Sequence, residues 1–536
     1  MPPSVSKPCN GQIAEFAAGL RSQHELEGHQ FKWLFLIVAV TFCYLYISLF
    51  SHSGIPYFRL GDQADFWTYA CRLLSGQVFL RDFHQFTPPG TDLFYAAVFH
   101  WFGISMRSIN WTVLGLGVVL VIVCYFVARS ILRPGMAALA ALLCLVMLYA
   151  DRLDATHHWF SSLADLLAVL VLSYRRSWLR IAAAGALIAL AAFFTQTRGA
   201  AGLLACCAGL GWEWRSGQTS LRVLWSRWML LFGVTFAVWL VLSWRFIAQA
   251  GLANYWYEQV IYPPKDVPFP IGFLTPHFTW SAHPRPAIAL FDHLTMYVLL
   301  LLVCPWVMIL CARRRSKTTR SSVALFLLAS LGFSQTLEII TMLNWVRMAA
   351  AAMPSMILAV WLISRMGPAR RSVVAACWCI VAATILAESV AMQTHPYIRA
   401  ELPTGVALLP TGAALLELDN AGEVLWLTQH TRRGDPFFEA ASTRFYALLA
   451  LENPTPVHLL AATDFTLPSW VTEVVRGLEQ SRTRYILWSS RAGIGSVEQM
   501  HALPGDHLDP LRIYMQHAYK RAAVFADGSE MWERRN

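Results

Sequence analysis

Long apolar runs, separated by short polar connections, repeat along most of the chain. Each run is close to the ~20 residues that a helix needs to cross ~30 Å of hydrocarbon. The pattern therefore predicts an α-helical polytopic membrane protein with about eleven transmembrane helices. The apolar runs cover residues 33–50, 108–128, 136–150, 158–174, 181–195, 200–212, 228–247, 293–311, 323–341, 348–364 and 372–392.

The first apolar run follows a polar segment, residues 1–32, that has no apolar core of its own. The run at 33–50 lacks a convincing small-residue cleavage site. We therefore interpret it as a retained first span rather than as a signal peptide, and we expect residues 1–32 to be a cytoplasmic N-terminal segment.

Cationic side chains are unequally distributed between the connections. One alternate set, which includes 313–320 and 365–371, carries sixteen Lys and Arg residues, whereas the short connections of the other set carry three. Because cytoplasmic loops are enriched in Lys and Arg, the asymmetry predicts a cytoplasmic N-terminus and an extracytoplasmic C-terminus. Residues 51–107, 248–292 and 393–536 then face the outside.

A further apolar stretch, residues 90–103, is expected to lie on the outer membrane surface. It is short for a span, it carries Asp92 and His100, and a crossing here would invert the charge asymmetry of every later loop. We assign it, together with residues 62–75, as juxtamembrane helices on the outer surface.

The C-terminal segment, residues 393–536, differs from the rest in its pattern. Amphipathic helical stretches alternate with short β-rich runs, and Thr483–Trp488 resembles a strand that follows a helix. The pattern predicts a small extracytoplasmic α/β domain without a nucleotide-binding glycine loop.

The composition agrees with lipid as the main solvent. Of the residues, 56% are hydrophobic and 14% are charged, against roughly 25% charged in soluble domains. The formal net charge of +10 resides mostly in short loops, which argues against nucleic-acid binding. The eleven cysteines form no C-x-x-C pair, so the sequence predicts neither a disulfide framework nor a zinc site.

Ionisable groups collect at the outward ends of the spans. Such groups are costly at membrane depth and by default indicate function, although each one alone could simply contact water and lipid headgroups. Together, acids and cations around an apolar cavity suit a reaction on a lipid-linked phosphate, with a carboxylate as base and cations on the leaving phosphate. The candidates are Asp62, Asp65, Arg81, Asp82, Asp154, His157, His158, Gln196, Arg198, Lys265 and Arg347.

The stretch DQADFWTYACRLLSGQVFLRDFHQFTPPGTDLFYAAVFHWFG, residues 62–103, resembles the first outer loop of the GT-C glycosyltransferases. The resemblance is to the branch of the protein mannosyltransferases and aminoarabinose transferases. Their acid lies about fourteen residues before a Gly, as Asp62 does before Gly76. The matching residues that follow are Arg81, Asp82, Phe83, Pro88, Pro89, Phe102 and Gly103.

Weaker similarity continues to about residue 210. Asp154 is the best match to the second acidic loop of the family, and AFFTQTRGAAGLL, which contains Gln196, resembles a short outer turn usually written with Lys or Gln. Two positions depart from the family. Where the family often has an Asp-Glu pair, this chain has Asp62 followed by Gln63. Where some relatives have a Glu that binds metal, this chain has Phe86, so we expect no metal at that position. The sequence implies no cofactor, and a divalent metal elsewhere stays open.

The resemblance implies a GT-C-like transmembrane domain, residues 33–392, in a bacterial inner membrane. The donor would be a polyprenyl-phosphate-linked sugar, the acceptor a protein, lipid or glycan, and the product part of a cell-envelope glycan. Asp62 would act as general base, with Asp65 and Asp154 as further catalytic candidates. Arg81, Arg198, Lys265 and Arg347 would stabilise the leaving phosphate, and Asp82, His157, His158 and Gln196 would bind substrate.

Two other classes of function are compatible with many spans. A secondary transporter would carry two related halves and interrupted helices near the membrane midplane, whereas this sequence has no evident internal repeat and its acids cluster at one face. A non-catalytic, glycan-binding membrane protein is the second alternative, because Gln63 departs from the family's acidic pair.

Overall fold

The structure is a computed structural model. It describes residues 31–50, 62–150, 153–174, 176–263, 294–313, 320–340, 345–393, 397–410, 421–440, 442–489, 494–500 and 505–535.

Each apolar run of the sequence falls on a helix of one bundle. In lipid a chain must satisfy its backbone N–H and C=O groups internally, which favours helices for such runs. The bundle elements are Phe31–Phe50, α4 (Met106–Arg129), α5 (Pro134–Leu143) with the π-helical η1 (Cys144–Tyr149), α6 (His157–Tyr174), α7 (Trp178–Phe194), α8 (Gln196–Arg215), α9 (Leu221–Ala250), η4 (Leu299–Val303) with α13 (Cys304–Arg313), α14 (Arg320–Ile339), α15 (Trp345–Ala351), α16 (Met353–Ser364) and α17 (Pro368–Gln393).

Serine side chains begin three of these helices. Ser105, Ser177 and Ser220 each accept a hydrogen bond from the backbone N–H three residues on, which satisfies one of the donors left unpaired at a helix N-terminus. Five helices within the described residues are by themselves long and apolar enough to cross a membrane. The polytopic helical architecture is thus confirmed, and the count of eleven spans stays a prediction.

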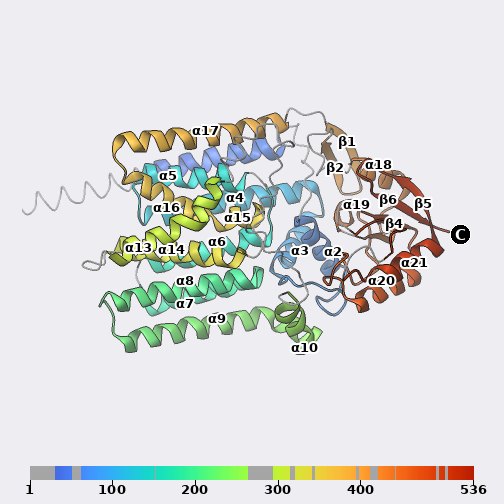
Figure 1. The fold of residues 1–536 in the computed structure, drawn as a ribbon, viewed down its shortest axis with the longest axis horizontal. Coiled ribbons are helices and arrows are strands. Elements are labelled where there is room, and N and C mark those ends of the chain that lie inside the picture. The colour runs from blue at the N-terminus through green and yellow to red at the C-terminus, as the bar shows by residue number, and fades with distance from the viewer. Residues whose placement is uncertain are drawn as a thin grey trace, which may run out of the picture.

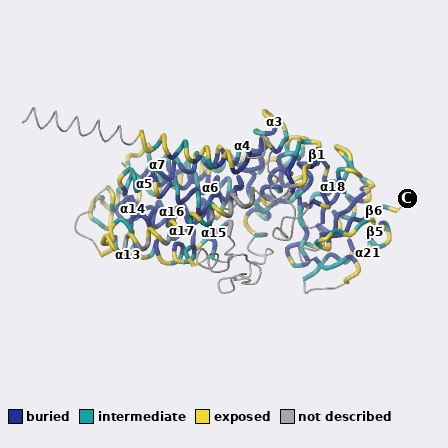
Figure 2. The backbone as a smooth tube through the Cα atoms, turned by 90° about the horizontal axis from the view of Figure 1, so that it is seen from above, coloured by how far each residue is buried: buried dark blue, intermediate teal, exposed yellow. Residues whose placement is uncertain are grey.

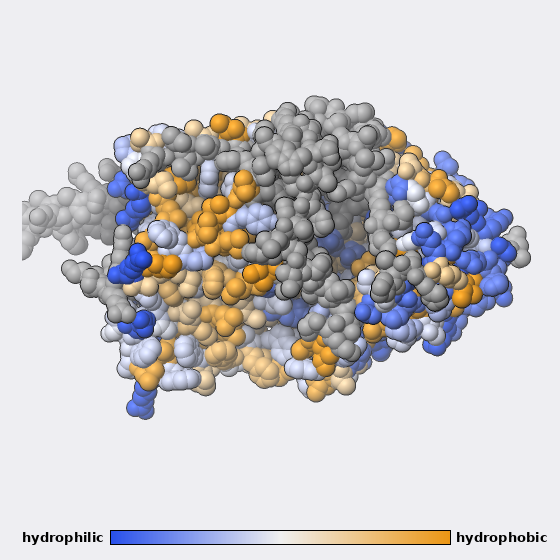
Figure 3. Space-filling model, in the orientation of Figure 1, coloured by the Kyte–Doolittle hydropathy of each residue, from blue (hydrophilic) through white to orange (hydrophobic). Residues whose placement is uncertain are grey.

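The two ends of the bundle differ. The helix ends that carry Arg215, Arg222 and Arg370, where α8 meets α9 and α16 meets α17, lie at one end, and the C-terminal α/β region lies beyond the other (Figure 1). Figure 3 shows apolar surface over the bundle between hydrophilic residues at its far edge and the hydrophilic C-terminal region. This arrangement agrees with the charge asymmetry of the sequence, while which end is cytoplasmic stays a prediction.

Helices α2 (Gln63–Leu74) and α3 (Gly90–Phe102) lie between the bundle and the C-terminal region (Figure 1). A helix of the length of α3 measures ~20 Å, which is shorter than the hydrocarbon layer. At the end of α3, Trp101 and Phe102 are 78% and 73% exposed, as suits a helix that touches a membrane surface. That both helices lie on this surface stays a prediction.

Residues from Tyr397 onward form strands and helices around two small sheets. The strands β1 (Tyr397–Leu402) and β2 (Gly405–Pro410) form an antiparallel hairpin. The second sheet has the order β3-β4-β6-β5, in which only β3 and β4 run parallel. The strand expected at Thr483–Trp488 is present as β4. The remaining elements are α18 (Ala421–His430), β3 (Phe437–Glu439), α19 (Tyr446–Leu449), α20 (Pro468–Gln480), β4 (Tyr485–Trp488), α21 (Asp509–Ala518), β5 (Tyr519–Val524) and β6 (Glu530–Arg534).

Apolar packing joins the C-terminal region to the bundle. Buried residues fill the interior of both parts (Figure 2), and one continuous cluster of buried apolar side chains runs from the bundle into α19, which packs on α2. The α2 helix is therefore held from both sides, by the bundle and by the C-terminal region.

Candidate active site

Two carboxylates lie at the N-terminal end of α2. Asp62 directly precedes the first helical residue, and Asp65 lies in the first turn. Carboxylates at this end of a helix are stabilised by its unpaired backbone N–H groups. Asp62 is exposed and Asp65 is half-buried, so a substrate reaches the first carboxylate more easily than the second.

The C-terminal region contacts the second carboxylate directly. The hydroxyl of Thr443 donates a hydrogen bond to Asp65, and Thr68 Oγ1 donates to the Thr443 carbonyl at 3.3 Å. Burial raises the pKa of Asp65 to about 7; the hydrogen bond from Thr443 opposes this rise, whereas the charges of Asp62 and Glu439 add to it. A carboxyl group that titrates near neutral pH is typical of acid–base sites.

A cation from the bundle faces the same end of α2. Arg347, near the start of α15, is half-buried, and the charges of Glu338, Arg198 and Asp62 act on its guanidinium, in decreasing order of strength. The structure therefore brings together one predicted acid and one predicted phosphate-binding cation that are 285 positions apart in the sequence.

Arg198 lies behind Arg347 and is fully buried. Its guanidinium donates to Ser162 Oγ and to the Arg347 carbonyl, each at 3.1 Å, and its Nε lies 3.1 Å from Glu338 Oε2. Thr197 Oγ1 also donates to Glu338, at 2.8 Å. Arg198 thus joins α6, α8, α14 and α15, and its bond to the Arg347 carbonyl makes it a residue that positions Arg347.

His157 and His158 begin α6 next to α2. The ring centroid of His157 lies 5.0 Å from that of Phe66 on α2 and 3.9 Å from that of His158. Both histidines are buried, and the charges of Arg198 and Arg347 act on both rings. The two histidines, the two arginines and the start of α2 therefore meet in one place.

Asp154 is held in the connection between η1 and α6. Its Oδ1 accepts a hydrogen bond from Trp159 Nε1 at 2.7 Å, and the side chain is 8% exposed. The neighbouring Ala155 carbonyl accepts from the Tyr95 hydroxyl at 3.0 Å, which fixes this connection to α3. Asp154 is thus a buried acid beside α3, with one oxygen held by an indole.

Gln196 binds backbone rather than facing the acids. Its Nε2 donates to the Phe86 carbonyl at 2.9 Å and to the Gln259 carbonyl at 3.1 Å. Gln259 Nε2 in turn donates to the Gln85 carbonyl at 2.8 Å. These bonds join α8 to the loop between α2 and α3 and to η2 (Tyr257–Ile261).

Arg81 and Asp82 lie near the other end of α2. They pair with each other at 2.8 Å, and Asp82 Oδ2 accepts from the Val78 backbone N–H at 2.7 Å. The hydrogen bond from Arg81 holds the pKa of Asp82 below its usual range. The length of α2, about 17 Å, separates this pair from Asp62. Lys265 lies outside the described residues.

The position that carries a metal ligand in some relatives is apolar here. The Phe86 ring lies 6.3 Å from that of Tyr262 and 6.2 Å from that of Phe465, and Tyr262 donates to the Phe465 carbonyl at 2.6 Å. Phe86 therefore helps to attach the C-terminal region to the outer loop. Among the described residues, no group of three or more His, Cys, Asp or Glu could hold a metal.

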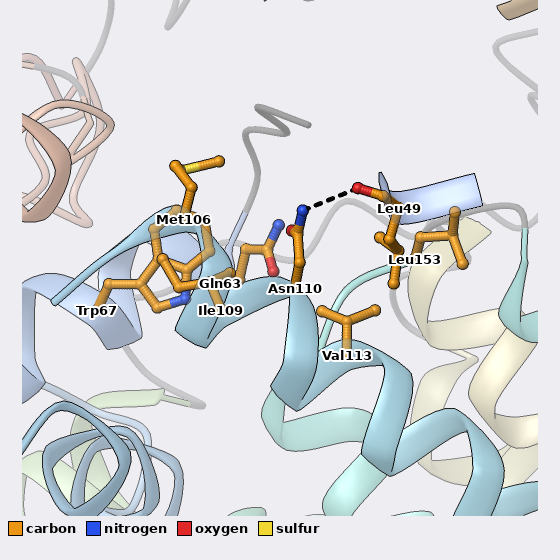
Figure 4. Close-up of a pocket in the computed structure, with 8 residues that line it drawn as sticks. All are labelled: Leu49, Gln63, Trp67, Met106, Ile109, Asn110, Val113 and Leu153. Atoms are coloured by element: carbon orange, nitrogen blue, oxygen red, sulfur yellow. Dashed lines mark hydrogen bonds between the residues drawn. The ribbon is translucent and has the colours of Figure 1, made fainter. Parts of the chain in front are cut away.

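Gln63, which replaces the family's Glu, is buried against α4. It lines a narrow crevice with Trp67, Asn110 and Leu153 (Figure 4), and this crevice is too tight for water. Asn110 Nδ2 donates to the Leu49 carbonyl at 3.2 Å, which joins α4 to the first helix. The Gln63 side chain thus packs between helices.

A histidine clamp between the outer loop and the C-terminal region was not predicted from the sequence. His84 Nδ1 lies 2.8 Å from Glu258 Oε1, its Nε2 lies 3.0 Å from Glu473 Oε2, and its ring stacks on Trp470 at 4.6 Å. Burial alone would lower the pKa of His84, but the hydrogen bonds to Glu258 and Glu473 raise it to about 9. A protonated His84 therefore joins the outer loop, η2 and α20.

Two other residues of the site, Glu338 and Thr443, were also missed, but only the first carries a signal in the sequence. Glu338 is an acid within an apolar run, which is by itself a signal of function at membrane depth. Thr443 carries no such signal, because a lone threonine 378 positions from Asp65 has nothing in its sequence context that connects the two.

Three solved structures have similar folds. The ArnT protein of Cupriavidus metallidurans bound to undecaprenyl phosphate has a TM-score of 0.53 at 12% identity, over 94% of this chain and 98% of its own. The chain has the GT-C fold. The oligosaccharyltransferase of Archaeoglobus fulgidus in complex with Zn and sulfate has a TM-score of 0.51 at 12% identity, over 93% of this chain and 73% of its own.

The AglB oligosaccharyltransferase of the same archaeon, in complex with an inhibitory peptide and a dolichol-phosphate, has a TM-score of 0.50 at 10% identity, over 94% of this chain and 74% of its own. No family model matches the sequence, and no curated protein matches it significantly. At these identities the likeness concerns the GT-C fold, and it agrees with the similarity of residues 62–103 to the outer loop of GT-C enzymes.

Proposed function

We propose that the protein is a membrane glycosyltransferase that moves a sugar from a polyprenyl-phosphate donor to an acceptor hydroxyl. The observation that carries the proposal is the meeting of Asp62 and Asp65 with Arg347 and the two histidines at the start of α2. Two neighbours in the GT-C fold are recorded with undecaprenyl phosphate and with dolichol-phosphate, which supports a lipid-linked donor.

In the proposed reaction, the acceptor oxygen attacks the anomeric carbon of the sugar. The bond from this carbon to the phosphate oxygen breaks, and the polyprenyl phosphate leaves with the electron pair. The acceptor proton passes to the Asp62 carboxylate, which is exposed and therefore accessible. A single displacement inverts the anomeric configuration, through a transition state of oxocarbenium character.

Arg347 is the favoured cation for the leaving phosphate, because it is partly accessible and faces Asp62. Arg198 would act through Arg347 rather than on the substrate, since its guanidinium is bound to Ser162, Glu338 and the Arg347 carbonyl. We propose Asp154, beside α3, as a substrate-positioning acid. The acceptor class is a protein, a lipid or a glycan.

The decisive test is transfer from a polyprenyl-phosphate sugar by purified variants. We expect Asp62→Asn to lower turnover by about 10²–10⁴-fold, because the amide is nearly isosteric but accepts no proton. Asp65→Asn should cost less, and Asp154→Asn should lie between the two. Asp464→Asn is a matched control, since Asp464 is exposed in the C-terminal region.

Near wild-type turnover in Asp62→Asn with an inactive Asp65→Asn would identify the other carboxylate as the base. Full activity in all three variants would rule out this mechanism. The wild type should also release sugar from a labelled donor, and failure to do so would favour a transporter or a glycan-binding protein.

We further propose that the start of α2 faces the outside of a bacterial inner membrane. A reporter that is active only outside the cytoplasm should work when fused after Asn536, and it should fail when fused near Arg315, within one of the Arg-rich connections. The reverse pattern would place Asp62 in the cytoplasm.

A further inference from the structure

A second cavity lies at the far end of α2, away from the acids. Its volume is about 210 Å³, which corresponds to roughly seven water molecules at ~30 Å³ each. Apolar side chains of α2, α3 and α9 form much of its wall, among them Leu73, Leu74, Leu93 and Phe246. No carboxylate contributes to the lining.

Three polar side chains face this cavity. Arg245 and Gln249 lie one turn apart on α9, and Gln77 follows the end of α2. The Gln77 side-chain carbonyl accepts from Arg72 Nε at 2.7 Å, which leaves its amide N–H groups as donors. Within the described part of the chain, the Arg245 guanidinium makes no hydrogen bond or ion pair.

The surroundings of Arg245 are those of a membrane interface. It lies five residues before the end of α9 at Ala250, at the bundle end next to α2 and α3 (Figure 1). Its helix neighbours Val241 and Trp244 are 77% and 62% exposed, as expected of residues that face lipid and headgroups. Arg245 is itself exposed, and an exposed arginine beside a membrane surface attracts anionic lipid headgroups.

We propose that this cavity holds the phosphate of a bilayer phospholipid. Arg245 binds the phosphate, Gln77 and Gln249 donate hydrogen bonds to headgroup oxygens, and the leucines contact the first carbons of the acyl chains. The reacting phosphate of a sugar donor is a different group, because the cavity lies about 17 Å along α2 from Asp62. The bound lipid fastens α9 to the loop after α2.

The test is native mass spectrometry of the full chain in detergent, titrated with dioleoyl phosphatidylglycerol. The wild type should retain one phospholipid. Arg245→Gln should bind it at least about tenfold more weakly, since a charge-assisted hydrogen bond is lost. Arg222→Gln is the matched control, because Arg222 is exposed at the opposite end of the same helix. It should behave as the wild type.

A second variant tests the cavity itself without changing any charge. Leu74 is 41% exposed, so Leu74→Trp should fold, fill the cavity and displace the phospholipid. Equal retention of phosphatidylglycerol by the wild type and Arg245→Gln would overturn the proposal. It would also be overturned if undecaprenyl phosphate displaced the phospholipid from the wild type, because the cavity would then belong to the donor lipid.

Discussion

The two sides of α2 are held by contacts of different kinds. On the bundle side, the partners are fixed groups: Phe66 lies against His157, and Arg347 faces Asp62 from a network centred on the buried Arg198. On the side of the C-terminal region, the contacts join segments more than 370 residues apart. They are Asp65 to Thr443, Arg72 to Thr455 and His84 to Glu473.

The two sides of α2 therefore have different roles: one positions the side chains of the site, and the other affects their protonation. The bundle places the cation and the histidines, whereas the C-terminal region contacts two groups that titrate outside their ordinary ranges, Asp65 at about 7 and His84 at about 9. Removal of a bundle contact should therefore destroy the site, while removal of a C-terminal contact should shift its dependence on pH.

The largest effect is expected on the bundle side. Arg198→Gln removes the cation that lies 3.1 Å from the Glu338 carboxylate, and breaking a buried ion pair typically costs about 3–5 kcal/mol. We expect a lower midpoint of thermal unfolding and a loss of turnover, measured on purified protein in detergent. The comparison is with Arg347→Gln, which should lose turnover but keep its unfolding midpoint, because Arg347 is half-buried.

A second substitution tests whether the loss of stability in Arg198→Gln comes from the unpaired charge of Glu338. Glu338→Gln in the Arg198→Gln background should restore part of the stability, since neither partner is then charged. If Arg198→Gln unfolded like the wild type and kept full activity, Arg198 would not position Arg347 and the proposed division of roles would fail.

The bundle was also the part that the sequence predicted best. Each apolar run became a helix because hydrocarbon leaves the backbone no other partners. The choice of Asp62, which came from the resemblance to the GT-C outer loop, stays a prediction. Roles were harder to predict than positions. Arg198 and Arg347 looked alike in the sequence, yet the first is bound on three sides and the second is partly accessible.

The C-terminal contacts could not be predicted, for a physical reason. The hydrogen bond from Thr443 to Asp65 depends on how α19 packs on α2, and hydropathy contains no information on that docking. The same holds for His84, whose two glutamates come from η2 and α20.

A smaller effect is expected from Thr443→Ala. Loss of the hydroxyl removes a hydrogen bond that lowers the pKa of Asp65, so this pKa should rise above about 7. Ionised Asp65 makes the adjacent Asp62 more basic, and the rise of kcat/KM with pH should therefore move to higher pH. At pH 7 we expect turnover to fall about three- to tenfold, as one pKa unit changes the ionised fraction roughly tenfold.

Thr443→Ser is the control for this prediction, because it keeps the hydroxyl and should keep the wild-type profile. The rise of kcat/KM near pH 7 should be absent from Asp65→Asn. If the rise persisted in Asp65→Asn, it would belong to another group, and the C-terminal region would not set the ionisation of the site.

The smallest effect on turnover is expected where His84 attaches the C-terminal region, because the change there is in stability. Its pKa in the folded protein is about 9, above the ~6.5 of an unfolded histidine. The stabilisation by protonated His84 is therefore fully present below pH ~6.5 and is lost as the pH rises through about 9. Neutral His84 would also leave Glu258 and Glu473 close together without the cation between them.

The measurement is the midpoint of thermal unfolding from pH 6 to 10, for the wild type and His84→Gln. We expect the wild-type midpoint to fall over this range, because a pKa raised from ~6.5 to about 9 corresponds to roughly 3 kcal/mol of stability. His84→Gln should start lower and vary less, because its amide donates hydrogen bonds without titrating. Burial, together with the charges of Arg72 and His84, lowers the pKa of the neighbouring His458 to about 3. His458 is therefore neutral over this range, so His458→Gln serves as the control and should keep the wild-type slope. Parallel curves for the wild type and His84→Gln would show that this clamp does not couple the C-terminal region to pH.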